Sequence, residues 1–108
     1  MTVRETVLVD ARYAVCGDRD HQYGSPEDSF ERIARLWSAY LSRPLLTSDV
    51  ANMMILFKVG RNITGEPKLD NWVDIAGYAA CGADCQFSKL ILEQVPTEDD
   101  TRLKSESK

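Results

Sequence analysis

Apolar side chains recur along this chain with the 3.6-residue period of amphipathic helices. The pattern divides into segments over residues 4–16, 26–41, 47–63 and 69–93. No stretch shows the strict alternation of apolar and polar residues that is typical of a half-buried strand. The sequence therefore predicts an all-α fold of four helices.

The breaks between these segments contain helix caps and turn residues. Ser25 followed by Pro26 is typical of a helix start, because serine caps the first turn and proline fits the first helical position. Gly17 and Pro44 are placed to end the first and second helices. In the second helix, the side chains predicted to be buried are Phe30, Ile33, Ala34, Trp37 and Leu41.

Length and composition favour one globular domain. The chain has 108 residues, of which 44% are hydrophobic and 28% charged. We expect residues 1–94 to form the domain and residues 95–108, which are charged and lack aromatics, to form a disordered tail. The net charge of −4 argues against a broad basic face, so a long nucleic acid is not an expected partner.

The sequence also predicts a cytoplasmic location. No apolar run approaches the ~20 residues that cross a membrane, and the N-terminus lacks the pattern of a signal peptide. Cys16, Cys81 and Cys85 are an odd count, which is typical of reduced thiols in the cytoplasm. Cys81 and Cys85 share one helical stripe, but the chain has a single histidine and no second cysteine pair, so a core role is favoured over zinc.

Two polar signatures open the third and fourth helices. They are Asp49-Val50-Ala51-Asn52 and Asn71-Trp72-Val73-Asp74. Each places two oxygen-bearing side chains one turn apart, and eighteen residues separate the pairs. An antiparallel helix pair that gathered these four residues would bring the acids within about 10 Å and offer the oxygen ligands that Mg²⁺ prefers. The alternative is structural, because acids in a first turn are favoured by the helix dipole.

Lys58 and Arg61 form a second candidate site. They lie one turn apart in an otherwise apolar helix, and such a pair suits phosphate oxygens. The alternative is a solvated outer face. At 100° per residue Lys58 lies opposite Asp49, so one straight helix does not aim both at the same site, and Lys58 would then serve a neighbouring subunit.

The segment His21-Gln22-Tyr23-Gly24 precedes the Ser25 cap. Histidine and tyrosine stack on bases, glycine allows close approach, and a helix N-terminus attracts anions. The alternative is an ordinary polar surface loop. Trp37 and Trp72 occupy apolar helical positions and are interpreted as core or interface residues.

Together these residues resemble the all-α nucleoside triphosphate pyrophosphatases, the MazG and dimeric-dUTPase-like proteins, whose signature is ExxE followed after 12 to 28 residues by ExxD. Of the four signature positions only Asp74 matches by identity, since Asp49 is a shorter acid and Asn52 and Asn71 replace carboxylates. Residues 20–84 are also similar to small phage-associated proteins related to nucleotide-modification-associated domains, which carry a His/Tyr-Gly loop and the helices DVAxMMxxxK and DNWVDIAGYAA.

The resemblance implies a MazG-like four-helix bundle completed by oligomerisation, as a homodimer or homotetramer, with a nucleotide ligand. The leading hypothesis is a Mg²⁺-dependent pyrophosphohydrolase that cleaves the α–β phosphoanhydride of a (deoxy)nucleoside triphosphate or a modified nucleotide. The expected roles are metal binding by Asp49, Asn52, Asn71 and Asp74, catalysis by the same two acids, phosphate binding by Lys58 and Arg61, and base or sugar contacts by His21 and Tyr23.

Two further hypotheses stay open. Neutral amides in place of two carboxylates lower the affinity for a cation, which favours a non-catalytic phage protein that sequesters a nucleotide. The other is a helical interaction protein with no small ligand. The paired signatures and the Lys58/Arg61 pair count against an interaction protein without a small ligand.

Overall fold

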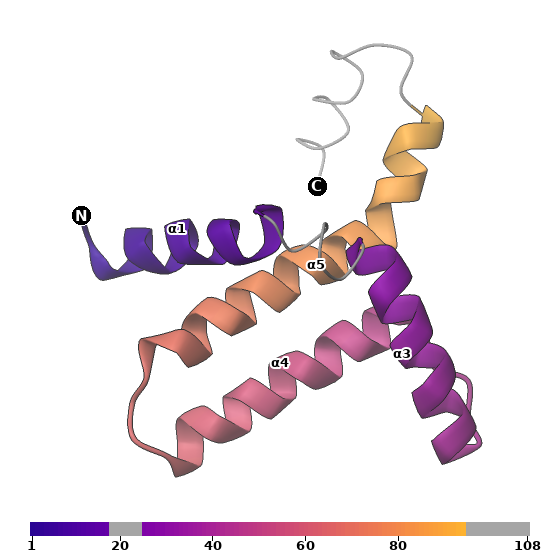
Figure 1. Cartoon of the computed structure of the whole chain (residues 1–108), viewed down its shortest axis with the longest axis horizontal. Coiled ribbons are helices and arrows are strands. Elements are labelled where there is room, and N and C mark those ends of the chain that lie inside the picture. The colour runs from indigo at the N-terminus through magenta and orange to yellow at the C-terminus, as the bar shows by residue number, and fades with distance from the viewer. Residues whose placement is uncertain (18–24, 95–108) are drawn as a thin grey trace.

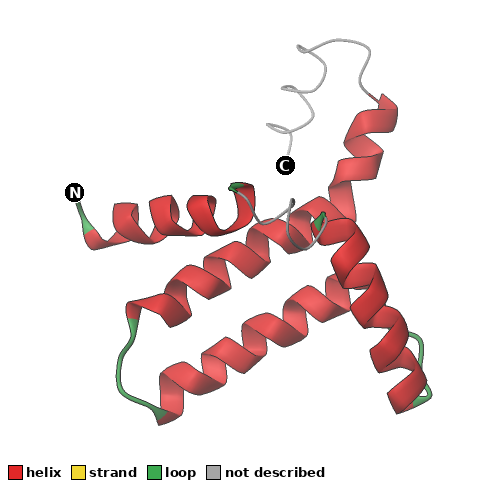
Figure 2. Cartoon of the chain, viewed as in Figure 1, coloured by secondary structure: helices red, strands yellow, loops and turns green. Residues whose placement is uncertain are grey.

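The computed structural model describes residues 1–17 and 25–94, with side chains described as far as residue 87. Over these residues it forms four helices and no strand (Figure 2). The helices are α1 (Val3–Cys16), α3 (Pro26–Leu41), α4 (Thr47–Thr64) and α5 (Leu69–Gln94). The predicted all-α, four-helix fold is confirmed, with helix bounds close to those expected from the hydrophobic period.

Local hydrogen bonds explain where the first helices begin. The Ser25 hydroxyl accepts a hydrogen bond from the Asp28 amide at 3.2 Å, which confirms the predicted cap of α3. At α1, the Glu5 amide donates to the Thr2 hydroxyl at 3.1 Å, and the Thr2 amide donates to the Glu5 carboxylate at 2.8 Å. The backbone donor at Thr2 lowers the pKa of Glu5, because it stabilises the ionised carboxylate.

The helices are arranged around the antiparallel hairpin of α4 and α5. Helix α1 lies along α5 on the side away from α4, and α3 crosses the hairpin at the end opposite its turn (Figure 1). The Cys85 thiol, 3.8 Å from the Pro26 carbonyl oxygen, marks this crossing. The turn end of the hairpin is therefore left uncovered by α3.

The core lies where α3 crosses the hairpin. Its buried residues are Phe30, Ala34, Val50, Ala51 and Cys81. A Cβ atom added to Gly82 would lie 2.8 Å from the Cβ of Ala51, so glycine is needed for the close approach of α5 to α4. This contact fixes which residues of the two helices face each other.

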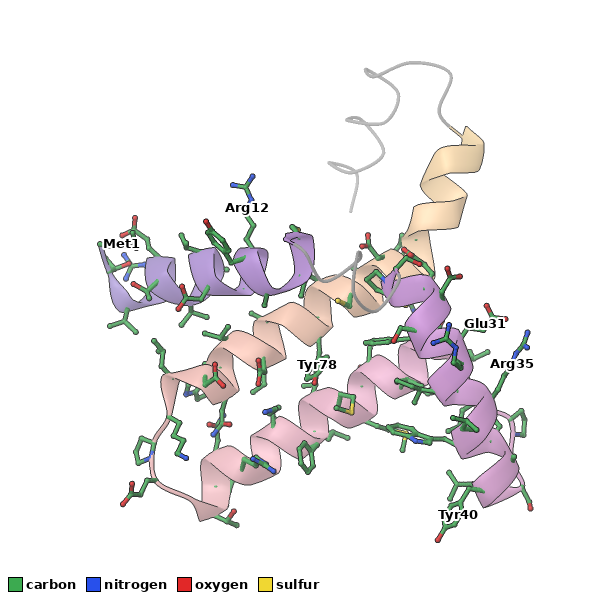
Figure 3. All side chains as sticks on the ribbon, viewed as in Figure 1. Met1, Arg12, Glu31, Arg35, Tyr40 and Tyr78 are labelled. Carbon is green, nitrogen blue, oxygen red and sulfur yellow. The ribbon has the colours of Figure 1, made fainter. Side chains whose placement is uncertain are left out.

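Two predicted apolar positions differ from expectation. Leu41 is exposed rather than buried, because the last turn of α3, which also carries Tyr40, extends beyond the hairpin (Figure 3). Trp72 is 57% exposed, which excludes a core position and leaves the interface alternative as a prediction, whereas Trp37 packs against the core. None of the described helices combines the length and apolar character needed to cross a membrane.

The three cysteines are free thiols. Cys81 belongs to the core, as predicted, and Cys85 is half-buried beside it. Burial raises the pKa of the Cys85 thiol, against a smaller opposing effect of a hydrogen bond with Thr47. Among the described residues, no group of three or more histidine, cysteine or acidic side chains is placed to hold a metal ion.

Candidate functional site

Lys58 forms an ion pair across the hairpin with Asp74. The distance from Lys58 Nζ to Asp74 Oδ2 is 2.7 Å, and the two side chains are 15% and 31% exposed. Lys58 thus faces α5 and is not on a solvated outer face, so that alternative is wrong for this residue. Its partner belongs to the same chain, whereas the helical geometry of α4 alone had suggested a role in a neighbouring subunit. Because the pair is partly buried, removal of either partner would leave an uncompensated charge.

A cleft of about 320 Å³ lies at the turn between α4 and α5, and its lining residues Arg61 and Asn71 are each one helical turn from this ion pair. Its lining residues are Arg61, Thr64, Gly65, Glu66, Lys68 and Asn71. Arg61 lies over the ring of Phe57, with its Cζ atom 4.7 Å from the ring centroid, which favours one orientation of the guanidinium group. Asn71 is buried in the first turn of α5.

The helical spacing explains why these residues meet. On α4, Arg61 lies one turn after Lys58, towards the hairpin turn. On α5, Asn71 lies one turn before Asp74, in the same direction because the helices are antiparallel. Pairing of Lys58 with Asp74 therefore brings Arg61 level with Asn71. We refer to Lys58, Arg61, Lys68, Asn71 and Asp74 as the turn-end site.

Asp49 and Asn52 lie at the other end of the hairpin. Both predicted signatures open their helices, and antiparallel helices place their first turns at opposite ends. Asp49 precedes Lys58 by nine residues, which is about 13 Å along the helix axis. Asn52 lines a groove with Tyr78 and Ala79 instead of approaching Asp74. Within one chain, the hairpin therefore separates the two halves of the predicted ligand set.

The structural interpretation of Asp49 has direct support. Its Oδ2 atom accepts a hydrogen bond of 2.8 Å from the Leu46 amide, which satisfies a free N–H group at the start of α4. The Asp74 carboxylate already faces the Lys58 ammonium group. The four residues expected to bind Mg²⁺ thus do not fit one metal site within a single chain.

Two residues that line the cleft were not predicted from the sequence. Lys68 and Thr64 line it because the turn between antiparallel helices brings its own residues against both helix ends. The sequence signal for Lys68 was a lysine directly before the first turn of α5, where it can reach an anion bound at the turn.

His21 and Tyr23 lie outside the described residues, so their predicted contacts with a base or sugar stay predictions.

A larger cleft, of about 680 Å³, lies between α3, the segment after it and α5. Its charged side chains include Glu31 and Arg35, which pair with each other at 2.7 Å and are both largely exposed (Figure 3). Ser38 is engaged as well, since its hydroxyl accepts a hydrogen bond of 2.9 Å from the Leu45 amide. Of the predicted site residues that the structure describes, none lines this cleft, and the turn-end site is the stronger candidate.

Comparisons with known proteins place the turn-end site inside a shared domain. A family described as a domain of unknown function (DUF6378) matches residues 6–86. The chain is 40% identical over 77 residues to the Gene 55 protein of Mycobacterium phage D29, covering 71% of this chain and 51% of that protein. It is 37% identical over 98 residues to the Gene 55 protein of Mycobacterium phage L5, covering 90% and 56%. The chain thus spans about half the length of these curated relatives, and no solved structure matches it.

Proposed function

Because this chain belongs to the DUF6378 family and is related to mycobacteriophage Gene 55 proteins, we propose that it is a phage-type nucleotide-binding protein. The proposed contact is between the turn-end site and the phosphate groups of the nucleotide. The observation that carries the proposal is that Arg61 and Lys68 line one cleft with Asn71, beside the ion pair of Lys58 and Asp74.

Arg61, Lys68 and Asn71 suit a polyphosphate, whereas the Glu66 carboxylate, which also lines the cleft, opposes an anion. The guanidinium of Arg61 has the planar fork that binds two phosphate oxygens at once, and Lys68 adds a compact positive charge. The Asn71 side-chain amide offers further donors. The cleft volume of about 320 Å³ is at the lower end of small-molecule sites. A chain of phosphates fits this size better than a whole nucleotide does.

Lys58 would join the site by exchanging partners. Its ammonium group lies against the Asp74 carboxylate, one turn along α4 from Arg61. A phosphate bound at Arg61 would compete with Asp74 for this charge, and the flexible lysine side chain can turn between them. In this proposal Asp74 holds Lys58 in place before the ligand arrives, and its own charge weakens the binding of the anion.

Binding without hydrolysis is the better-supported version of the function. The Asp49 carboxylate caps α4, and the Asp74 carboxylate is neutralised by Lys58. Mg²⁺ is therefore not part of the proposed binding mode. In this proposal the chain is a divergent relative of the all-α nucleoside triphosphate pyrophosphatases that keeps contacts to phosphate and has lost part of the carboxylate set.

A pyrophosphohydrolase is the second candidate. Asp70 and Asp74 lie one turn apart on one stripe of α5, and Asp70 is exposed. This pair favours an acidic site on α5 that differs from the set predicted from the two signatures. The two candidates agree on the ligand and disagree on the fate of its phosphoanhydride bond.

A panel of nucleoside and deoxynucleoside triphosphates with MgCl₂ separates the candidates, when heat of binding and release of pyrophosphate are both measured. We expect binding of at least one nucleotide without release. Asp74→Asn should then strengthen binding, because the variant releases the partly buried Lys58 ammonium group from its partner and removes a charge of the same sign as the ligand.

Asp74→Asn should impair the protein if it is an enzyme, whereas it should improve nucleotide binding if the protein only binds. If Asp74 takes part in hydrolysis, Asp74→Asn should lower turnover by about 10² or more. Asp10→Asn, on the exposed face of α1, is the matched control and should change neither quantity. A panel with neither binding nor release would refute both candidates and leave a helical interaction protein as the remaining hypothesis.

A further inference from the structure

The Phe57 ring lies on the surface of α4 next to the turn-end site. It is 51% exposed, and the guanidinium of Arg61, a residue that lines the cleft, lies over the ring with its Cζ atom 4.7 Å from the centroid. Single exposed apolar residues are common on protein surfaces, so exposure alone gives Phe57 no role. Its contact with a residue of the cleft is what places the ring beside a bound ligand.

Gly60 leaves open space beside this ring. A helical side chain leans back over the turn before it, so a side chain at position 60 would lie next to Phe57. A Cβ atom added to Gly60 would find nothing within 4 Å, and α4 lies at the edge of the structure opposite α1 (Figure 1). Glycine inside a helix lowers its stability relative to alanine, and no close neighbour explains the glycine here. The missing side chain leaves room for a flat ring against Phe57.

This open surface is continuous with the cleft. Thr64, which lines the cleft, donates a hydrogen bond from its hydroxyl to the Gly60 carbonyl oxygen at 3.0 Å. Arg61 belongs to both surfaces through its contact with Phe57. Because the cleft suits a chain of phosphates better than a whole nucleotide, the rest of a bound nucleotide must lie outside it. The surface of Phe57 and Gly60 adjoins the cleft and carries an aromatic ring.

We propose that the base of the nucleotide stacks on Phe57 in the space beside Gly60, while its phosphates bind at Arg61 and Lys68. This inference rests on the proposed function and adds a base subsite to it. Stacked aromatic rings have centroids about 4.5–7 Å apart. A base at that distance from Phe57 stays close to phosphates held by Arg61, because the guanidinium is itself 4.7 Å from the Phe57 centroid. The sugar then bridges the two subsites.

Stacking on Phe57 predicts which nucleotides bind best. Every base has a π-face, and the side chains of phenylalanine and glycine have no donor or acceptor that could read the edge of a base. Purine nucleotides should therefore bind more tightly than pyrimidine nucleotides, because the larger ring covers more of Phe57. Adenine and guanine nucleotides should bind about equally. Tighter binding of pyrimidine nucleotides would contradict the proposed subsite.

The test compares ATP with inorganic tripolyphosphate by isothermal titration of the full chain. Tripolyphosphate has the phosphates without the base, so the ratio of the two affinities reports on the base subsite. Phe57→Leu should lower this ratio by about 5- to 10-fold, the lower end of what a stacked base contributes. The ratio is used because Phe57 also orients Arg61, which affects both ligands. Tyr40→Leu removes a ring that is 89% exposed on α3 and should leave the ratio unchanged.

Gly60→Leu tests the open space without removing the ring. A leucine three residues after Phe57 packs on the ring and takes the place of the base, so the ratio should fall here as well. The space at Gly60 accepts the new side chain and leucine is a better helix former than glycine, so the helical circular dichroism should be kept. The amide of Gly60 in ¹⁵N-labelled wild type should shift with ATP and not with tripolyphosphate.

The outcomes separate this inference from the proposed function. Binding of both ligands with a ratio that neither Phe57→Leu nor Gly60→Leu changes would overturn the base subsite and keep the phosphate site. Binding of neither ligand by the wild type would refute the proposed function, and the subsite with it. A lower molar mass of Phe57→Leu in light scattering, with an unchanged ratio, would overturn the subsite and assign Phe57 to a contact between protein chains.

Discussion

Replacement of Phe30 by alanine is expected to lower the free energy of unfolding by about 3–5 kcal/mol, the cost of removing a buried aromatic ring. Phe30 is 3% exposed and belongs to the cluster where α3 crosses the α4–α5 hairpin. Domains of this size are stable by only about 5–15 kcal/mol. Phe30→Ala should therefore be partly or fully unfolded at low urea concentration, as measured by circular dichroism at 222 nm.

Tyr40→Ala is the matched control, because Tyr40 is an aromatic residue of the same helix and is 89% exposed. We expect it to change the free energy of unfolding by no more than about 0.5 kcal/mol. Equal and small effects of the two substitutions would mean that α3 does not pack on the hairpin. The core described above would then be wrong.

Replacement of Arg61 by glutamine is expected to weaken nucleotide binding about 10- to 100-fold. Hydrogen bonds to a charged group contribute about 1.5–3 kcal/mol, and glutamine keeps a polar side chain but loses the charge and the fork of donors. Arg61 is exposed, and its side chain lies over the Phe57 ring on the surface of α4. Arg61→Gln should therefore leave the fold unaffected. Isothermal titration with the nucleotide of highest affinity in the panel measures the effect.

Arg35→Gln removes a positive charge from α3 and serves as the control. Arg35 pairs with Glu31 on the same helix and points away from the hairpin (Figure 3). Its loss should leave nucleotide affinity within about twofold, because the charge is solvent-exposed and distant from the turn. If both arginine variants lose affinity equally, the effect reflects overall charge, and the turn-end site would not be the binding site.

The helices could be predicted from the sequence because each is encoded locally. The apolar period marks the bodies of the helices, and Ser25 with Pro26 marks the start of α3 through a hydrogen bond that the structure contains. Leu41 and Trp72 were less predictable. Whether an apolar position on a helix is covered depends on the length and place of its neighbours, which the period does not specify.

The candidate site was predicted only in part, because it depends on the register between α4 and α5. Spacing alone placed Lys58 with Arg61 on one stripe and Asn71 with Asp74 on another. Which residues face each other is set by the close contact of Gly82 with Ala51 and by the turn. The sequence grouped Asp49 with Asp74, whereas the hairpin pairs Asp74 with Lys58.

The most direct test of phosphate binding at the turn-end site is a titration of ¹⁵N-labelled protein with ATP and, separately, with inorganic tripolyphosphate, followed by amide chemical shifts. Both ligands should shift the amides of Gly65, Lys68 and Asn71, because the phosphate chain is the part that they share. Shifts confined to the amides of Leu45 and Ser48, which line the larger cleft beside α3, would contradict the proposed site, as would no shifts with either ligand.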